Sequence, residues 1–335
     1  MDSRNIQKQI FEQISQHIAP VNLAEDIAKL FNTTKSSVYR RINGETALSM
    51  EELMILLKHY PFLSFDKLTR PHQVSYTFPS LTGKPNNTFA YLNTMEQSMQ
   101  QIALFPNALI GYAAQEIPFF HYLMLPEMAA FKFYVWSRTV WGLETARNKS
   151  FDLSEYEQDD IFRNQIHRLF LSYASIDSEE IWHSNMPDIT LNQVRHAYLS
   201  GYFKNKADML KVLTSIRVLI ENMRKMAASG EKKATNFDAP SVGNLKVWYN
   251  ELVHHSAVIL VQLTEKQRFI YNIFDAPNFI YSHDPSVCAY SFTFFDRLKT
   301  YALPVFGGVN ERNLVLLFQR IDKKIEAFEQ ELITD

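Results

Sequence analysis

Near the N-terminus, apolar and polar positions follow the pattern of two short amphipathic helices joined by a polar turn. In residues 23–31 the apolar side chains recur at intervals of three and four, which places them on one helix face. Residues 32–34 interrupt this pattern: Asn32 is of the non-glycine type that best tolerates a left-handed conformation, and Thr34 can cap a second helix that begins near Lys35. Gly44 ends that helix, because glycine adopts the left-handed conformation after a helix without steric cost. The pattern predicts a helix, a turn and a second helix.

The second helix of this motif has a narrow apolar face. Val38 and Ile42 lie one turn apart and are its only good core residues. At about 100° per residue, a buried face between them directs Arg40 to the opposite side. The guanidinium group of arginine can donate two hydrogen bonds to the edge of a guanine, and hydroxyl and ammonium groups can donate to phosphate oxygens. The pattern therefore predicts DNA contacts from Thr34, Lys35, Ser36, Ser37, Tyr39, Arg40 and Arg41.

The same run resembles the helix-turn-helix of the lambda repressor and Cro type, often called the XRE family. The resemblance covers about residues 4–68. It rests on the small Ala28, the polar turn, the hydroxyl-rich residues 34–38, the Asn43-Gly44 exit, and a further helix opened by the capping pair Ser49 and Glu52. It implies a sequence-specific transcriptional regulator that binds double-stranded DNA. A helical hairpin that only packs against other parts of the chain is the alternative.

The pattern beyond this motif predicts a mainly α protein. It comprises an N-terminal helix-turn-helix bundle, a central helical region, and a small C-terminal α+β region with a β-hairpin. The hairpin is expected from residues 252–263 and 268–274, which are separated by the polar residues 264–267. Residues 107–116 could instead form an extended segment. Helices are expected near 89–104, 126–143, 154–174, 190–203, 206–228, 284–302 and 310–332.

Changes in composition along the chain predict four segments. Residues 1–70 form the DNA-binding domain. Residues 71–88, rich in proline, glycine and asparagine, form a linker that could hold a short strand at 73–78. A helical regulatory or dimerisation region (89–235) and an α+β C-terminal region (236–335) follow.

The overall charge bears on how such a protein would bind DNA. The chain has 34 basic and 36 acidic side chains, a net charge of −2. Residues 1–70 hold nine basic and eight acidic side chains, a local charge of +1. Because phosphate contacts supply most non-specific affinity, one copy of this region is expected to bind DNA weakly. We therefore expect a homodimer.

An aromatic segment at 117–141 is the candidate site for a small apolar effector. Small-molecule sites are usually apolar, whereas most aromatic clusters are simply core, so both interpretations stay open. The candidate pocket residues are Phe119, Phe120, Tyr122, Tyr134 and Trp136.

No enzymatic, metal or cofactor site is expected. Glycine is scarce, at 9 residues, which disfavours glycine-rich loops that bind phosphate. His254 and His255 would point to opposite faces of a strand, so both cannot bind one metal ion. His283, Asp284 and Cys288 are of the types that serve as nucleophile and base, but Cys288 is expected inside an amphipathic helix and no group nearby would form an oxyanion site. The adjacent acids Asp159-Asp160 and Glu179-Glu180 are expected to be solvated on helix surfaces.

The compartment is expected to be cytoplasmic. Cys288 is the single cysteine, and the chain does not start with a signal-peptide pattern. The most apolar window, 117–135, is interrupted by prolines and charged residues, so no membrane span is expected. The sequence thus favours a cytoplasmic transcriptional regulator. A protein-interaction or assembly factor that uses the helix-turn-helix as a scaffold is the alternative.

Overall fold

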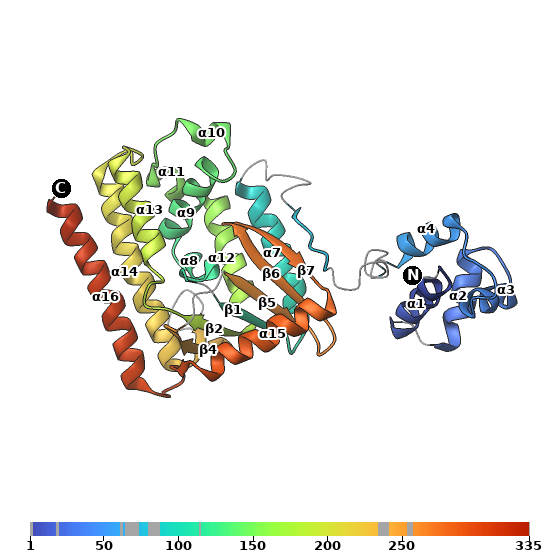
Figure 1. Ribbon diagram of the computed structural model, residues 1–335. Helices are drawn as coiled ribbons and strands as arrows, with labels where there is room; N and C mark the ends of the chain where they lie inside the picture. The colour runs from blue at the N-terminus through green and yellow to red at the C-terminus, as the bar shows by residue number, and fades with distance from the viewer. Residues whose placement is uncertain are drawn as a thin grey trace. The chain divides into compact units, whose positions relative to one another are not determined.

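The chain divides into two compact units, Met1–Ser75 and Tyr76–Asp335, which we call the reader and the body. Figure 1 colours the reader blue and the body from cyan to red. The computed structural model describes residues 3–17, 20–60, 63, 74–79, 88–113, 115–233, 241–252 and 257–334.

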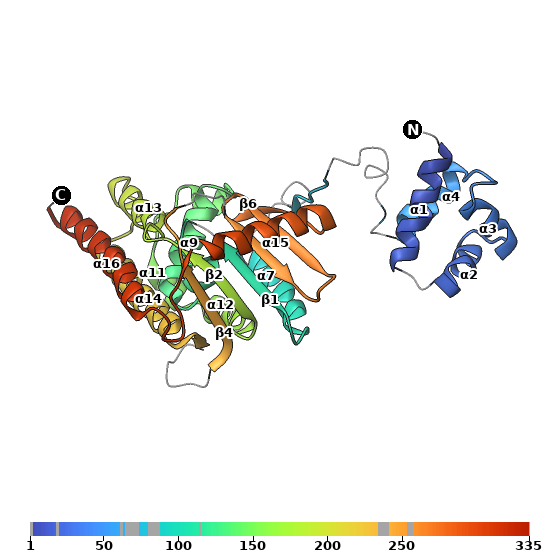
Figure 2. The ribbon, with the colours of Figure 1, turned by 60° about the horizontal axis from the view of Figure 1, so that its bottom comes forward.

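The described part of the reader is a small helical bundle (Figures 1 and 2). Ile14, Ile27, Val38 and Leu56 come from four different helices, and each is fully buried in its core. The apolar spacing seen in the sequence thus produces one shared core. The helices are α1 (Ser3–His17), α2 (Pro20–Leu30), α3 (Lys35–Ile42) and α4 (Met50–His59).

The described residues of the body form one eight-stranded mixed sheet. The strand order is β3-β4-β2-β1-β5-β6-β7, with β8 paired to β4. The neighbours β1, β2 and β4 run parallel, and the other pairs are antiparallel. The strands are β1 (Leu109–Ala113), β2 (Asp177–Trp182), β3 (Glu231–Lys233), β4 (Ser241–Tyr249), β5 (Val258–Gln262), β6 (Arg268–Asp275), β7 (Asn278–Ser282) and β8 (Leu303–Pro304).

Helices cover both faces of this sheet, and each face has its own core. On one face α15 contributes Cys288 and Phe295 to a cluster with Ile181, Leu260 and Ile270 of the strands (Figure 2). The other face carries the larger core. The described helices of the body are α7 (Thr88–Ala103), α8 (Phe119–Tyr122), α9 (Pro126–Arg138), α10 (Glu144–Arg147), α11 (Leu153–Glu157), α12 (Asp160–Ala174), α13 (Asp188–Leu199), α14 (Lys206–Ser229), α15 (Pro285–Thr300) and α16 (Glu311–Thr334).

The sheet makes the expected fold class wrong. A mainly α protein with a small C-terminal hairpin was expected, but strands from the central and C-terminal regions share one sheet. The expected boundary near residue 235 therefore separates strands that are hydrogen-bonded to one another. The predicted hairpin itself is confirmed as β5 and β6, which pair from Val258 opposite Asn272 to Gln262 opposite Arg268.

Several element boundaries also differ from expectation. The helix expected at 126–143 ends at Arg138, and the one expected at 190–203 spans Asp188–Leu199. The possible extended segment at 107–116 contains β1. In the possible strand at 73–78, of which residues 74–78 are described, Thr77 makes a β-bridge to Tyr281 of β7. In the part of the chain that the structure describes, no helix is long and apolar enough to span a bilayer.

Candidate functional site

The turn between α2 and α3 has the geometry that the sequence predicts. Asn32 has a φ of 50°, the left-handed conformation that asparagine tolerates better than most residues. Thr34 caps α3, because its hydroxyl oxygen accepts a hydrogen bond of 3.2 Å from the backbone amide of Ser37. Gly44 has a φ of 75° just beyond the helix, and Ser49 and Glu52 form the predicted capping box on α4.

One face of α3 is open to solvent. Val38 is fully buried, whereas Tyr39 is 54% exposed and the Arg40 side chain 64% exposed. An α-helix that packs through one residue leaves the residues of the opposite face free to meet another molecule. Five of the seven predicted contact residues are exposed: Thr34, Lys35, Ser36, Tyr39 and Arg40.

The other two predicted contact residues, Ser37 and Arg41, have intramolecular roles. The Arg41 guanidinium bonds both carboxylate oxygens of Glu52, with Nε 3.0 Å from Oε2 and Nη2 2.7 Å from Oε1. Its Nη1 donates to the Ser37 hydroxyl at 2.6 Å. Both charged side chains are only 16% exposed. Arg41 therefore ties α3 to α4 and is not free to meet a base.

Gln7 is a positioning residue that the sequence pattern did not indicate. This buried amide lies on α1 and donates to the backbone oxygens of Arg41 at 2.6 Å and Thr46 at 2.8 Å. Its own oxygen accepts from the backbone amide of Leu48 at 2.9 Å. Gln7 thus joins α1 to the C-terminal end of α3 and to the loop that follows it; the Arg41 oxygen also accepts from the backbone amide of Gly44 at 3.0 Å.

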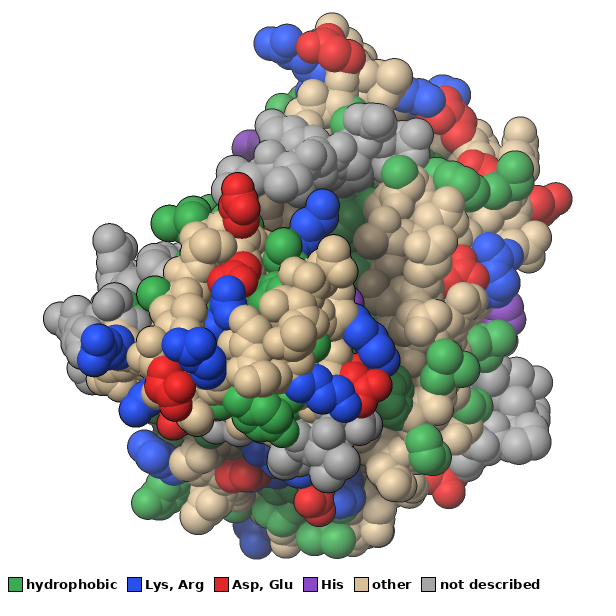
Figure 3. Space-filling view, turned by 90° about the vertical axis from the view of Figure 1, so that its right-hand side faces the viewer, with side chains coloured by type: hydrophobic (Ala, Val, Ile, Leu, Met, Phe, Trp, Pro, Cys, Tyr) green, Lys and Arg blue, Asp and Glu red, His purple; other side chains and the backbone are tan. Residues whose placement is uncertain are grey.

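The three basic residues of α3 lie near carboxylates. Lys35 Nζ lies 2.7 Å from Glu25, and Arg40 Nε lies 3.8 Å from Glu45. The hydrogen bond from Lys35 lowers the pKa of Glu25, and the same bond raises the pKa of Lys35. Figure 3 shows basic and acidic side chains next to one another on the face that it displays. The positive charge of α3 is therefore partly compensated within the reader.

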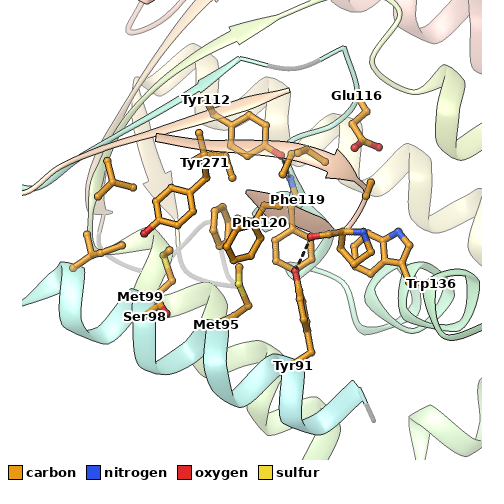
Figure 4. A pocket seen from close by; sticks show the side chains of 17 residues that line it. Tyr91, Met95, Ser98, Met99, Tyr112, Glu116, Phe119, Phe120, Trp136 and Tyr271 are labelled. Atoms are coloured by element: carbon orange, nitrogen blue, oxygen red, sulfur yellow. Dashed lines mark hydrogen bonds between the residues drawn. The ribbon is translucent and has the colours of Figure 1, made fainter. Parts of the chain in front are cut away.

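The aromatic segment of the body contributes to a small cavity and to the core. Phe119, Phe120 and Trp136 line a cavity of about 80 Å³ between α7 and the sheet (Figure 4). This volume is well below the roughly 300 Å³ at which ordinary ligand pockets begin. The other two candidates do not line it. The Tyr122 hydroxyl pairs with Thr190 at 2.6 Å, and Tyr134 borders a separate, more polar cavity of about 330 Å³.

Most residues that line the smaller cavity are apolar, and its lining also includes Glu116 and Tyr271. Tyr91 donates to the backbone oxygen of Pro277 at 3.3 Å, and Ser98 donates to that of Thr94 at 2.9 Å. The Tyr112 hydroxyl accepts from the Phe119 amide.

A buried charged network lies in the body's larger core. Glu180 of β2 is fully buried, so the expectation that it is a solvated surface residue is wrong. His121 Nε2 lies 2.9 Å from one of its oxygens, the Trp182 indole donates to the same oxygen at 2.7 Å, and the Tyr173 hydroxyl donates to the other. Burial alone raises the pKa of Glu180, but His121 and these hydrogen bonds outweigh it and lower the pKa to about 2.

Two buried lysines accompany this core. Lys232 donates to the backbone oxygens of Tyr173 and Ile176 at 3.0 and 2.5 Å, and burial lowers its pKa to about 7. Lys132 donates to the Gln193 amide oxygen at 2.9 Å, and burial likewise lowers its pKa. Desolvation disfavours the charged form of both groups.

The remaining candidates are structural or lie outside the described residues. Asp284 caps α15 through the backbone amide of Ser286 at 2.8 Å, and Cys288 lies buried inside that helix. Asp159 caps α12. His254 and His255 lie outside the described residues. Within the described ranges, no group of three or more His, Cys, Asp or Glu side chains could hold a metal ion.

Comparisons with protein-family models, with curated proteins and with solved structures find no match for this chain. The function is therefore inferred from the geometry of the reader and the body.

Proposed function

We propose that the protein is a sequence-specific DNA-binding transcriptional regulator in which α3 enters the major groove. The observation that carries this proposal is the exposed face of α3, where Tyr39 and Arg40 project away from the buried Val38. Arg40 would read a guanine, while Lys35 and Tyr39 would bind phosphates. The protein would act in the cytoplasm.

The binding unit would be a homodimer held together by the body. Compensated charge on the reader supports this, because one near-neutral reader has little electrostatic affinity for double-stranded DNA. Two linked readers on one duplex combine their binding free energies, and regulators of this kind usually bind two half-sites one helical turn apart.

A protein-interaction or assembly factor is the second candidate function. It is favoured by the same ion pairs, because carboxylates beside Lys35 and Arg40 weaken attraction to phosphate. Such a protein would use the bundle as a scaffold. It would show no salt-dependent binding to any duplex.

The test is selection of bound sequences from a random duplex library at about 50 mM salt. The proposal predicts enrichment of one motif with two related halves about 34 to 36 Å apart. Binding of the selected duplex should weaken steeply as salt rises. Failure to enrich any motif would favour the second candidate.

A further inference from the structure

We infer that the outer face of α4 binds the same face of α4 in a second copy of the chain, so that two readers touch each other directly. This contact adds to those that join the bodies. Its role on DNA rests on the proposed function, because readers that touch on one duplex bind it cooperatively. The contact itself can be tested without DNA.

The outer face of α4 carries exposed apolar side chains. Met50 is 72% exposed, Met54 59% and Ile55 38%. Among the described residues of the reader's four helices, the other large hydrophobic side chain that is exposed is Tyr39 of α3. Neighbouring apolar side chains that face water together, unlike single ones, mark an interaction surface.

Four exposed residues of α4 form a stripe that suits packing against another helix. These residues are Glu51, Met54, Ile55 and Lys58, at positions i, i+3, i+4 and i+7. At about 100° per residue they all lie within about 100° of one another, on the side of the helix away from the buried Leu56. Residues with this spacing line one side of a helix and can contact a second helix together.

The stripe is complementary to itself when two copies of α4 pack antiparallel. Glu51 lies in the first turn of α4 and Lys58 in its last turn. A two-fold axis between residues 54 and 55 brings Glu51 of each copy next to Lys58 of the other. The same axis places Met54 and Ile55 beside their own counterparts, so two pairs of opposite charges flank an apolar centre. A two-fold contact requires this self-complementarity, which is why we assign the face to a second copy.

The inner side of α4 links this contact to α3. Leu56 is fully buried in the reader's core, and Glu52 bonds the Arg41 guanidinium of α3 through both of its oxygens. The stripe is separate from these residues, so a second copy can bind without disturbing them. Because Arg41 ties α4 to α3, contact between two α4 helices also sets the two α3 helices relative to each other.

The contact is too small to hold two copies together by itself. α4 has 10 residues, whereas a stable interface uses about 20 to 30 residues on each side. Two readers held close by their bodies or by one duplex have an effective concentration of about a millimolar, at which a weak contact forms. The contact therefore couples the occupancy of two half-sites and does not create the dimer.

Cysteine cross-linking of the full-length protein tests the contact in the absence of DNA. Met54→Cys places a thiol beside its counterpart across the axis, and Cys288, the single natural cysteine, is buried. A short bismaleimide should link Met54→Cys about tenfold faster than Glu12→Cys, an exposed site on α1, because the contact holds the two thiols together. Equal rates at the two sites would overturn the inference, whether or not the protein binds DNA, and would leave the face to a different protein.

Exchange of charges tests the pairing of Glu51 with Lys58. In the Met54→Cys protein, Glu51→Lys or Lys58→Glu brings like charges together twice in the contact, and each should slow cross-linking about fivefold. The two substitutions together restore opposite charges and should restore the rate. Both single variants are used because a lysine in the first turn of a helix is itself unfavourable. No recovery in the double variant would overturn the pairing.

The same variants test the role of the contact on DNA. Glu51→Lys should weaken binding to the selected duplex about fivefold relative to binding to a duplex with one half-site, and the double variant should recover. Glu12→Lys makes the same change of charge on α1 and should affect both duplexes alike. If Glu51→Lys also affects both duplexes alike although cross-linking follows the pairing, the readers touch but do not cooperate on DNA, and that part of the inference is overturned.

Discussion

The side-chain amide of Gln7 donates a hydrogen bond of 2.6 Å to the backbone oxygen of Arg41, and so fixes the end of α3 to α1. The same amide also bonds Thr46 and Leu48 in the loop that follows α3. One buried residue from a different helix therefore sets where the C-terminal end of α3 lies. The exposed side chains of α3 depend on this placement.

Gln7→Ala should destabilise the reader by about 1 kcal/mol or more, because the Thr46 oxygen and the Leu48 amide lose their hydrogen bonds to the Gln7 side chain. Amide hydrogen exchange at Leu48 should become faster, since its hydrogen bond to Gln7 is lost. Gln9→Ala on the same helix, outside this set of bonds, is the control. Unchanged exchange at Leu48 in Gln7→Ala would contradict the assignment.

Arg41→Ala should destabilise the reader, and by more than Arg40→Ala does. Arg41→Ala removes an ion pair in which Arg41 bonds both oxygens of Glu52, and the side chains of these two residues are only 16% exposed. The Arg40 side chain, by contrast, is 64% exposed. A loss of about 1 to 3 kcal/mol is expected from hydrogen bonds between charged groups. Thermal unfolding of the reader in the two variants checks this order. Equal melting temperatures would show that the Arg41–Glu52 pair contributes nothing.

The body should lose stability in acid through Glu180. Its pKa is about 2 in the folded protein and about 4.5 when unfolded, so the stabilisation is complete above pH 4.5 and is lost as pH falls towards 2. The 2.5-unit difference corresponds to about 3 kcal/mol. The free energy of unfolding, measured with urea, should therefore depend less on pH between 4.5 and 2 in Glu180→Gln than in wild type. Glu144→Gln, at an exposed site, is the control and should leave this dependence unchanged. Parallel profiles for wild type and Glu180→Gln would refute it.

The protein should be a dimer whose contacts lie mainly in the body. The basic residues of α3 lie close to carboxylates of the reader, so two readers are needed for useful affinity. Light scattering at micromolar concentration should give twice the mass of 39.1 kDa. A monomeric mass together with a selected DNA site that lacks two-fold symmetry would contradict this prediction.

Local structure in the reader could be predicted from the sequence because its signals lie close together in the chain. Asn32, Thr34 and Gly44 each need only their neighbours to define a turn or a cap, and the structure places all three as expected. Gln7 was missed because its partners lie 34 to 41 residues away, and no periodic pattern reports such a bond.

The sheet of the body was underestimated for a different reason. β2 buries Ser178 and Glu180 beside Ile181 and Trp182, so it does not alternate apolar with polar residues as a half-buried strand does. Glu180 is stable in the core because His121, Tyr173 and Trp182 form hydrogen bonds to it, and His121 lies 59 residues away in the sequence. The cavity likewise forms from α7 and from strands that follow about 150 residues later.

Whether α3 reads DNA is tested most directly by comparing the DNA affinities of wild type and Arg40→Ala. Each protein is titrated with the duplex that the wild-type protein selects and with a shuffled duplex. Loss of a two-point contact to a base should cost about 1 to 3 kcal/mol, or roughly 5- to 150-fold, on the selected duplex only. The fold should be unchanged, because the Arg40 side chain is exposed. If Arg40→Ala keeps both its affinity and its preference for the selected duplex, α3 is not the element that reads DNA.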